Sequence, residues 1–256
     1  MDSTRSNEPP ISLVLAGGLG TRLRPLTDRV PKCLVEIGGF PLLEGWHAAL
    51  AAAGFDRAIV NAHAHAAQVE AWAQEASDRG PVQWTVFHEP ELLGSAGTLR
   101  AVLPQLERGR DFLVIYGDNL SEVDLGAFLA FHRDGGHEFT IALYEVPDPE
   151  SKGVVELDAN DRVVSFEEKP ERPRSNLVNA GLYAISRGVL GSIDWSEAFD
   201  LGHDVLPLLI SRMAGYRLHG YHRDIGTPES LESAERDLRE GRLVWPRAGR
   251  PNGGKP

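Results

Sequence analysis

Short apolar runs alternate with longer segments of helical periodicity between Ile11 and Val146, and this alternation constrains the fold strongly. The apolar runs have the length of buried strands, and the segments between them repeat apolar residues at helical spacing. We predict strands at Ile11–Ala16, Arg57–Asn61, Val82–Phe87, Phe112–Tyr116 and Phe139–Val146, and helices at Pro41–Ala53, His65–Ser77, Ala96–Leu103 and Leu125–His132. Such a pattern predicts an α/β fold with a mostly parallel sheet and helices on both faces.

The pattern changes after residue 150. Two strand-like runs, Gly153–Leu157 and Arg162–Glu167, flank the turn residues 158–161, which predicts a β-hairpin. Further elements are expected as a strand at Val178–Ile185, an amphipathic helix at His203–Arg212, a strand at Tyr216–His222 and a helix at Pro228–Arg239. We expect one domain over residues 11–240, a disordered tail over residues 1–10 and a loose tail over residues 241–256.

The composition excludes several classes of protein. A formal net charge of -11 disfavours a nucleic-acid partner, because nucleic-acid-binding domains concentrate positive charge. The single cysteine, Cys33, permits no intrachain disulfide and fits a reducing compartment. No run reaches the ~18–20 apolar residues of a membrane span, and the polar N-terminus lacks the apolar core of a signal peptide. These features predict a cytoplasmic protein with neither a membrane nor a nucleic-acid partner.

The stretch LVLAGGLGTRLRPLT, residues 13–27, places three glycines directly after the first predicted strand. Glycines at such a turn let backbone N–H groups approach an anion, because no Cβ stands in the way. The dinucleotide fingerprint fails, since Leu23 occupies the place of its third glycine, and the P-loop fails because no lysine follows. The residues favour another kind of phosphate-binding turn, in which Arg22 adds a planar fork of donors. A plain glycine turn with a solvated arginine stays open as the alternative.

Asp118 directly follows the most apolar predicted strand, at the end of the strand where α/β sheets bind ligands. A carboxylate there suits Mg²⁺, which takes one or two carboxylates together with substrate phosphates. Asp224 is the candidate for a second carboxylate. Each aspartate could instead belong to an ordinary turn or helix cap, and their spacing in the sequence does not show that they meet.

Seven motifs occur in order between residues 11 and 240: LAGGLGTRLRPLTDRVPKCLVEIGGFPLLE, LLGSAGTLRA, YGDN, GVVELD, EEKP, NAGLY and DIGTPE. Together they resemble the sugar-1-phosphate nucleotidyltransferases, in particular the short mannose-1-phosphate and heptose-1-phosphate guanylyltransferases without a C-terminal β-helix. The resemblance implies a Rossmann-like fold of the nucleotide-diphospho-sugar transferase type, with hairpins added in the second half. Cys33 and Lys152 depart from the family pattern, which commonly has a small apolar residue and an aromatic residue at these places.

The resemblance also assigns roles to residues within the motifs. The catalytic residues would be Arg22, Lys32, Asp118, Lys169 and Asp224, and Asp118 and Asp224 would hold Mg²⁺. The nucleotide would bind to Leu15, Ala16, Gly17, Gly18, Gly20, Thr21, Arg22, Glu89, Gly94, Ser95 and Asp118. The sugar 1-phosphate would bind to Asn119, Gly153, Glu168, Lys169, Asn179 and Gly181.

The implied reaction joins a nucleoside monophosphate from a nucleoside triphosphate to a sugar 1-phosphate and releases pyrophosphate. Glu89 favours GTP, because a carboxylate only accepts hydrogen bonds and guanine presents donors at both N1 and N2. Thymidylyl or uridylyl transfer to a glucose-, muramate- or cyclitol-type 1-phosphate stays open, as does a catalytically silent binding module. The expected partners are therefore the two substrates, and the resemblance is compatible with a homodimer.

Overall fold

The first half of the main sheet is parallel and forms around a buried first strand. The structure is a computed structural model that describes residues 9–106 and 111–245. Its parallel strands are β1 (Ile11–Leu15), β4 (Arg57–Ala62), β5 (Gln83–His88) and β6 (Asp111–Tyr116). They lie in the order β6-β1-β4-β5, so their carboxyl ends share one edge of the sheet.

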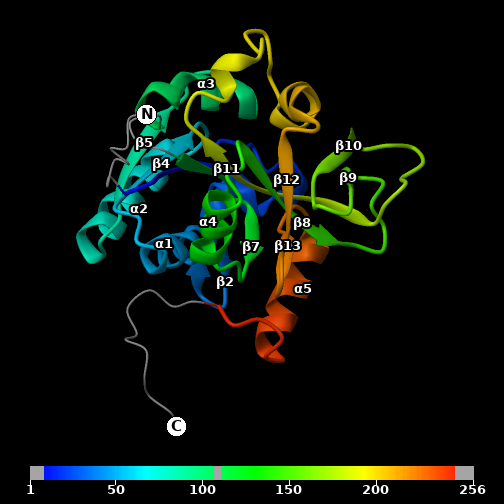
Figure 1. Cartoon of the computed structure of the whole chain (residues 1–256). Coiled ribbons are helices and arrows are strands. Elements are labelled where there is room, and N and C mark those ends of the chain that lie inside the picture. The colour runs from blue at the N-terminus through cyan, green and yellow to red at the C-terminus, as the bar shows by residue number, and fades with distance from the viewer. Residues whose placement is uncertain (1–8, 107–110, 246–256) are drawn as a thin grey trace.

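Antiparallel strands extend this sheet on the β6 side. They are β8 (Phe139–Glu145), β9 (Gly153–Leu157), β10 (Val163–Glu168) and β11 (Leu177–Ser186), and β12 (Met213–Arg217) adds in parallel to β8. β11 pairs with β6, β8 and β9, and it joins the two halves. The β9–β10 hairpin extends from one side of the molecule (Figure 1). The predicted α/β sheet with added hairpins is confirmed.

Helices cover both faces of the sheet (Figure 1). Alternate residues of β1 show this directly, because Leu13 packs in one apolar cluster and Val14 in the other. The Leu13 cluster contains α3 (Gly94–Leu106). The Val14 cluster contains α1 (Leu42–Ala52), α2 (Ala66–Arg79) and α4 (Leu125–Asp134). A strand buried on both faces is expected to be nearly continuously apolar, and β1 has the sequence ISLVL, in which Ser12 alone is polar.

Several short elements surround the carboxyl edge. Three 3₁₀ turns, Thr21–Leu23, Leu26–Asp28 and Lys32–Leu34, follow the glycine loop, and β2 (Glu36–Ile37) pairs with β3 (Phe40–Pro41). A separate ribbon pairs β7 (Asn119–Ser121) with β13 (His222–Asp224), and α5 (Pro228–Arg239) follows it. Strands of two or three residues carry no measurable periodicity, so the sequence did not predict them.

Two predicted elements are wrong. The helix expected at His203–Arg212 is a π turn at Leu201–Val205 followed by a 3₁₀ turn at Leu206–Leu209. Proline in this segment lacks the N–H of a helical ladder, and Ser211 takes the left-handed conformation, with φ 70°. The strand expected at Tyr216–His222 is divided between the end of β12 and the start of β13. Gly220, with φ 112°, turns the chain between them.

The packed region continues beyond the expected boundary at residue 240. Leu243 and Trp245 are buried in a cluster with Ile37 and Leu42, so residues 241–245 do not form a loose tail. Gly45 makes room for the indole, because a Cβ there would lie 2.4 Å from a Trp245 ring carbon. At the other end, Pro10 of the tail expected over residues 1–10 is buried. The remaining expected tail residues, 1–8 and 246–256, lie outside the described residues.

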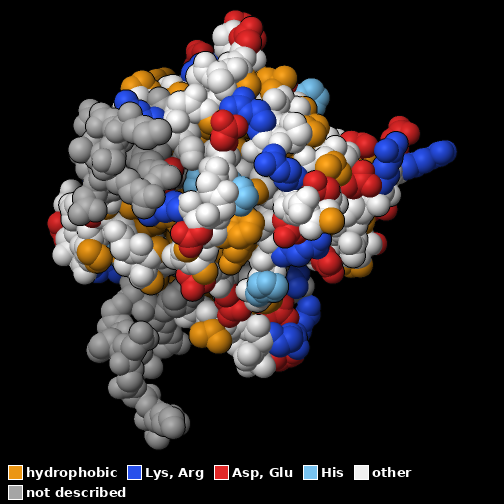
Figure 2. All heavy atoms as spheres, viewed as in Figure 1, with side chains coloured by type: hydrophobic (Ala, Val, Ile, Leu, Met, Phe, Trp, Pro, Cys, Tyr) orange, Lys and Arg blue, Asp and Glu red, His pale blue; other side chains and the backbone are white. Residues whose placement is uncertain are grey.

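The outer surface is polar and of mixed sign. Acidic and basic side chains are interspersed over the face seen in Figure 2. Within the described residues, none of the helices combines the length and the apolar character that crossing a membrane requires.

Candidate functional site

The glycine loop after β1 is held from beneath by two side chains. Asn61, near the end of β4, accepts hydrogen bonds from the backbone N–H groups of Ala16 and Gly17 at 2.6 and 3.2 Å. Thr27 donates its hydroxyl to the carbonyl of Gly20 at 2.8 Å. Gly20 has φ 60°, and a Cβ there would lie 2.8 Å from the Thr27 methyl group, so glycine is required. Gly18 has open space beside it, as a loop that receives a ligand needs.

Glu89 lies beneath this loop and is only 1% exposed. Its Oε1 accepts hydrogen bonds from the Asn61 amide at 2.9 Å and from the Thr98 hydroxyl at 2.5 Å. Its Oε2 accepts a longer one, 3.3 Å, from the backbone N–H of Leu93. Glu89 therefore orients Asn61 and, through it, the glycine loop, while Oε2 retains capacity to accept a further hydrogen bond.

A mainly apolar pocket of 260 Å³ opens above Glu89. Seven residues predicted to bind the nucleotide line this pocket: Leu15, Gly17, Gly18, Glu89, Gly94, Ser95 and Asp118. The other predicted nucleotide residues, Ala16, Gly20, Thr21 and Arg22, are not among its lining residues. Arg22 lines a neighbouring cleft instead.

The two candidate metal ligands meet across the β7–β13 ribbon. Asp224 pairs with Asn119, the neighbour of Asp118, and the N–H of Ile225 donates to the Asp118 carbonyl at 3.2 Å. The Lys32 ammonium lies between their carboxylates, 2.5 Å from Asp118 Oδ2 and 3.3 Å from Asp224 Oδ1. Lys32 is 7% exposed, and a buried ammonium needs negatively charged partners such as these two carboxylates.

Arg22 approaches the same carboxylates from the glycine-loop side. A Cβ on Gly226 would lie 2.9 Å from Arg22 Nη2 and 3.1 Å from Asp224 Oδ1, so the guanidinium and the carboxylate flank this glycine. The structure thus brings together Arg22, Lys32, Asp118 and Asp224, which lie far apart in the sequence.

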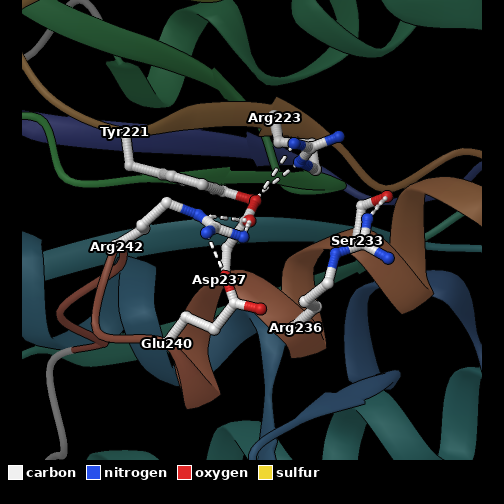
Figure 3. Close-up of polar contacts among 7 residues, drawn as sticks. All are labelled: Tyr221, Arg223, Ser233, Arg236, Asp237, Glu240 and Arg242. Carbon is white, nitrogen blue, oxygen red and sulfur yellow. Dashed lines mark hydrogen bonds and ion pairs between the residues drawn. The ribbon is translucent and has the colours of Figure 1, made fainter.

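The ribbon that carries Asp224 is anchored to α5. Asp237, on α5, accepts hydrogen bonds from the Tyr221 hydroxyl at 2.7 Å and from Arg223 at 3.1 Å (Figure 3). Arg242 also donates to it, at 2.6 and 2.9 Å. Burial opposes ionisation of Asp237, but these donors hold the pKa of its carboxyl below the ordinary value. The network fixes β13 from behind.

A polar cleft of 530 Å³ lies beside the first pocket. All six residues predicted to bind the sugar phosphate line it: Asn119, Gly153, Glu168, Lys169, Asn179 and Gly181. Burial raises the pKa of the Glu168 carboxyl, although the neighbouring Lys169 ammonium, 3.7 Å away, opposes this. The two asparagines also support the backbone, because Asn119 donates to the Ala180 carbonyl and Asn179 accepts from Gly181 N–H.

The pocket and the cleft share Tyr116 and Asp118, so they join beside the carboxylate pair. The family model described as "Nucleotidyl transferase" matches residues 11–241. The chain belongs to this family.

Two curated relatives of this chain are named as guanylyltransferases. The chain is 36% identical over 234 residues to "Mannose-1-phosphate guanylyltransferase" of Mycobacterium tuberculosis, which covers 90% of this chain and 65% of the relative. It is 34% identical to "Mannose-1-phosphate guanylyltransferase catalytic subunit beta" of Drosophila pseudoobscura pseudoobscura, covering 86% of this chain and 60% of the relative. The chain therefore spans less than two thirds of the length of either.

A solved structure of similar size shares the fold. HddC from Yersinia pseudotuberculosis superposes with a TM-score of 0.75 at 27% identity, covering 90% of this chain and 99% of HddC. A second structure of HddC is described as complexed with GMP-PN and matches equally well.

Several residues that line the two cavities were not predicted. Asn61 and Tyr116 end predicted strands, and a polar side chain at that place is a signal that could have found them. His222 ends the strand predicted at Tyr216–His222 and carried the same signal, although that strand is divided in the structure. Phe199 and Asp200 lie outside every predicted element and gave no signal. Burial and the Lys152 ammonium lower the pKa of His222 to about 3, so its imidazole is neutral where it packs on Tyr144.

Proposed function

We propose that this chain transfers GMP from GTP to a sugar 1-phosphate, giving a GDP-sugar and pyrophosphate. The observation that carries the proposal is the junction of the two cavities at Asp118, beside the Asp224 carboxylate and the Lys32 ammonium. An apolar pocket suits a nucleobase, and a polar cleft suits a sugar phosphate. Their junction is where the α-phosphate and the sugar phosphate would meet.

The choice of guanine rests on Glu89 and on the relatives. Glu89 is among the residues that line the apolar pocket, and its Oε2, which accepts one long hydrogen bond from Leu93, could accept a further one from guanine N1–H or N2–H. Both curated relatives carry guanylyltransferase names, and HddC has been solved with GMP-PN. The names of the relatives favour mannose 1-phosphate, and a heptose 1-phosphate is the second sugar to test.

Asp118 and Asp224 fit a divalent cation, because both carboxylates reach one positively charged atom, Lys32 Nζ. Within the described residues no group of three or more His, Cys, Asp or Glu forms a metal site, so substrate phosphates would supply the remaining ligands. Mg²⁺, bound there with the substrates, would neutralise charge on the α-phosphate.

The remaining cations act on the phosphates. Arg22 would bind the departing pyrophosphate with the glycine-loop amides, and Lys169 would hold the sugar phosphate at the cleft mouth. Lys32 keeps Asp118 and Asp224 close together beside the transferred group. A sugar phosphate is already ionised near neutral pH, since its second pKa is about 6, so the reaction requires no general base. A cytoplasmic location and a homodimer stay predictions.

Pyrophosphate release tests the proposal. Four nucleoside triphosphates are each combined with mannose-, glucose-, heptose- and amino-sugar 1-phosphates, with and without Mg²⁺. We expect release only when GTP, Mg²⁺ and one sugar 1-phosphate are present together, with mannose or heptose preferred. Faster release with dTTP or UTP would overturn the guanine assignment. GTP binding without turnover of any sugar phosphate would favour a silent binding module.

A further inference from the structure

Phe199 is an exposed aromatic residue on a firmly held backbone. Its side chain is 59% exposed. Its N–H donates to the Asp204 carboxylate at 2.9 Å, and its carbonyl accepts from Ala96 N–H, in the first turn of α3, at 3.0 Å. The adjoining residue is fixed as well, because the Ser95 hydroxyl donates to Asp200 at 3.1 Å. The exposure therefore does not come from a loosely held loop.

The Phe199 ring lies at the rim of the apolar pocket. It packs over Gly94, where a Cβ would lie 2.8 Å from ring carbons and 2.2 Å from the Phe199 carbonyl oxygen. Gly94 has φ 73°, so glycine is required there for both space and conformation. Phe199 and Leu92 line the pocket together with Glu89. One part of the ring thus packs on Gly94, and most of the residue remains exposed beside the pocket.

The ligand that fits this arrangement is flat, apolar on its faces and polar at its edge. A nucleobase has this form, since its faces stack on aromatic rings and its edge carries hydrogen-bond donors. Glu89 and Asp118 both line the same pocket. The Glu89 carboxylate can accept from the base edge, and the phosphates are expected beside Asp118 under the proposed function. A sugar phosphate belongs in the polar cleft, to whose lining Phe199 does not contribute.

We propose that Phe199 stacks on the nucleobase of the bound nucleoside triphosphate. The inference rests on the proposed function, because it assumes that the apolar pocket receives the base. Phe199 then supplies affinity for any base, while Glu89 selects among bases. This division follows from the chemistry of the two side chains, because stacking tolerates every base and hydrogen bonding does not.

Calorimetric titration of GTP in the presence of Mg²⁺ tests the proposal. Phe199→Ala and Phe199→Leu both remove the ring, and the leucine variant keeps an apolar contact on Gly94. We expect the Kd for GTP to rise roughly 5- to 150-fold in both, the range that base–aromatic stacking spans. Phe199→Tyr, which keeps the ring, should bind GTP within about threefold of the unmodified protein.

Two controls separate stacking from other effects. Leu208→Ala removes another exposed apolar side chain, 48% exposed and outside both cavities, and should leave the Kd unchanged. Inorganic tripolyphosphate, which has no base, should inhibit GTP binding equally in all variants.

The outcomes are distinguishable. Failure of the unmodified protein to bind any nucleoside triphosphate would overturn the proposed function itself. GTP binding by the unmodified protein with an equal Kd in Phe199→Ala, or a loss shared by tripolyphosphate or Leu208→Ala, would overturn stacking alone. A change of oligomeric state in Phe199→Ala without a change in Kd would assign the ring to a subunit contact instead.

Discussion

Lys32 and the two aspartates illustrate how single residues determine this site. The two carboxylate side chains are about one third exposed, whereas the Lys32 side chain between them is only 9% exposed. Loss of both would leave Lys32 unpaired in the interior, which is strongly destabilising. Loss of one leaves the other in contact with Lys32, so the reaction can be separated from folding.

Asp118→Asn should lower the rate of pyrophosphate release by roughly 100-fold or more, because a neutral amide is a poor ligand for Mg²⁺. The fold should survive, since Asp224 still pairs with Lys32. Steady-state release and thermal unfolding are measured on the same samples. Asp134→Asn, which removes an exposed carboxylate on α4, is the matched control and should change neither quantity. Normal turnover in Asp118→Asn would refute the metal assignment.

Glu89→Gln separates the two roles of this buried residue. The amide oxygen can still accept from Asn61 and Thr98, whereas the amide N–H₂ takes the place of Oε2 as a donor and no longer accepts the long hydrogen bond from Leu93 N–H. We expect kcat/KM for GTP to fall about tenfold or more relative to the other triphosphates, because two donors meet at the base edge. The ratio of kcat/KM for GTP to that for UTP is the measurement. An unchanged ratio would limit Glu89 to orienting the glycine loop.

At the scale of elements, the short β7–β13 ribbon controls the geometry of the site. Two strands of three residues are too short to be stable alone, so the ribbon depends on what it packs against. On the β13 side that support is α5, whose N-terminus is capped by Thr227 in a reciprocal pair with Ser230. Asp237 then joins the helix to the strand.

Asp237→Ala should lower the free energy of unfolding by about 1–3 kcal/mol, because Tyr221, Arg223 and Arg242 all lose their shared acceptor. Turnover should fall as well, since β13 carries Asp224. Arg236→Ala on the same helix removes a hydrogen bond to the Ser233 hydroxyl and should change the free energy of unfolding by no more than about 0.5 kcal/mol (Figure 3). Equal stability of the two variants in urea unfolding would show that the network does not hold the ribbon.

At the scale of the whole molecule, the core beneath the sheet contains a buried histidine that must remain neutral. His47 accepts a hydrogen bond at Nδ1 from the Trp84 indole at 2.9 Å and packs near Trp72. Burial lowers the pKa of His47 below its ordinary value of 6.5. Below about pH 6.5, His47 therefore binds a proton more readily in the unfolded chain than in the folded chain. The free energy of unfolding decreases as the pH falls.

His47→Gln should reduce the loss of stability between pH 7.5 and pH 5. Glutamine can accept from the Trp84 indole without titrating, so one proton-linked contribution disappears. Urea unfolding at both pH values, with and without the substitution, gives the difference directly. The variant is expected to be less stable than the unmodified protein at pH 7.5 and closer to it at pH 5. Parallel pH profiles would show that His47 does not contribute.

The strands around the glycine loop, the hairpin after residue 150 and most candidate site residues could be predicted from sequence. Each depends on neighbours along the chain: an apolar run such as Ile11–Leu15, the turn residues of the hairpin, or a motif read in order. The helix expected at His203–Arg212 failed because helical periodicity alone did not account for the proline within it and the left-handed Ser211. Local patterns thus specify local structure and the chemical types available to the site.

Tertiary structure alone decided which of those residues meet. Asp118 and Asp224 come together through pairing of β7 with β13, and Phe199 is held at the apolar pocket by a hydrogen bond to the start of α3. Glu89, expected only to read a base, also orients Asn61 beneath the glycine loop. Such contacts depend on the pairing of distant segments and on packing in three dimensions. The strength of these contacts depends on how deeply the charged groups are buried and on the partners that compensate their charge. Neither can be predicted from spacing along the chain.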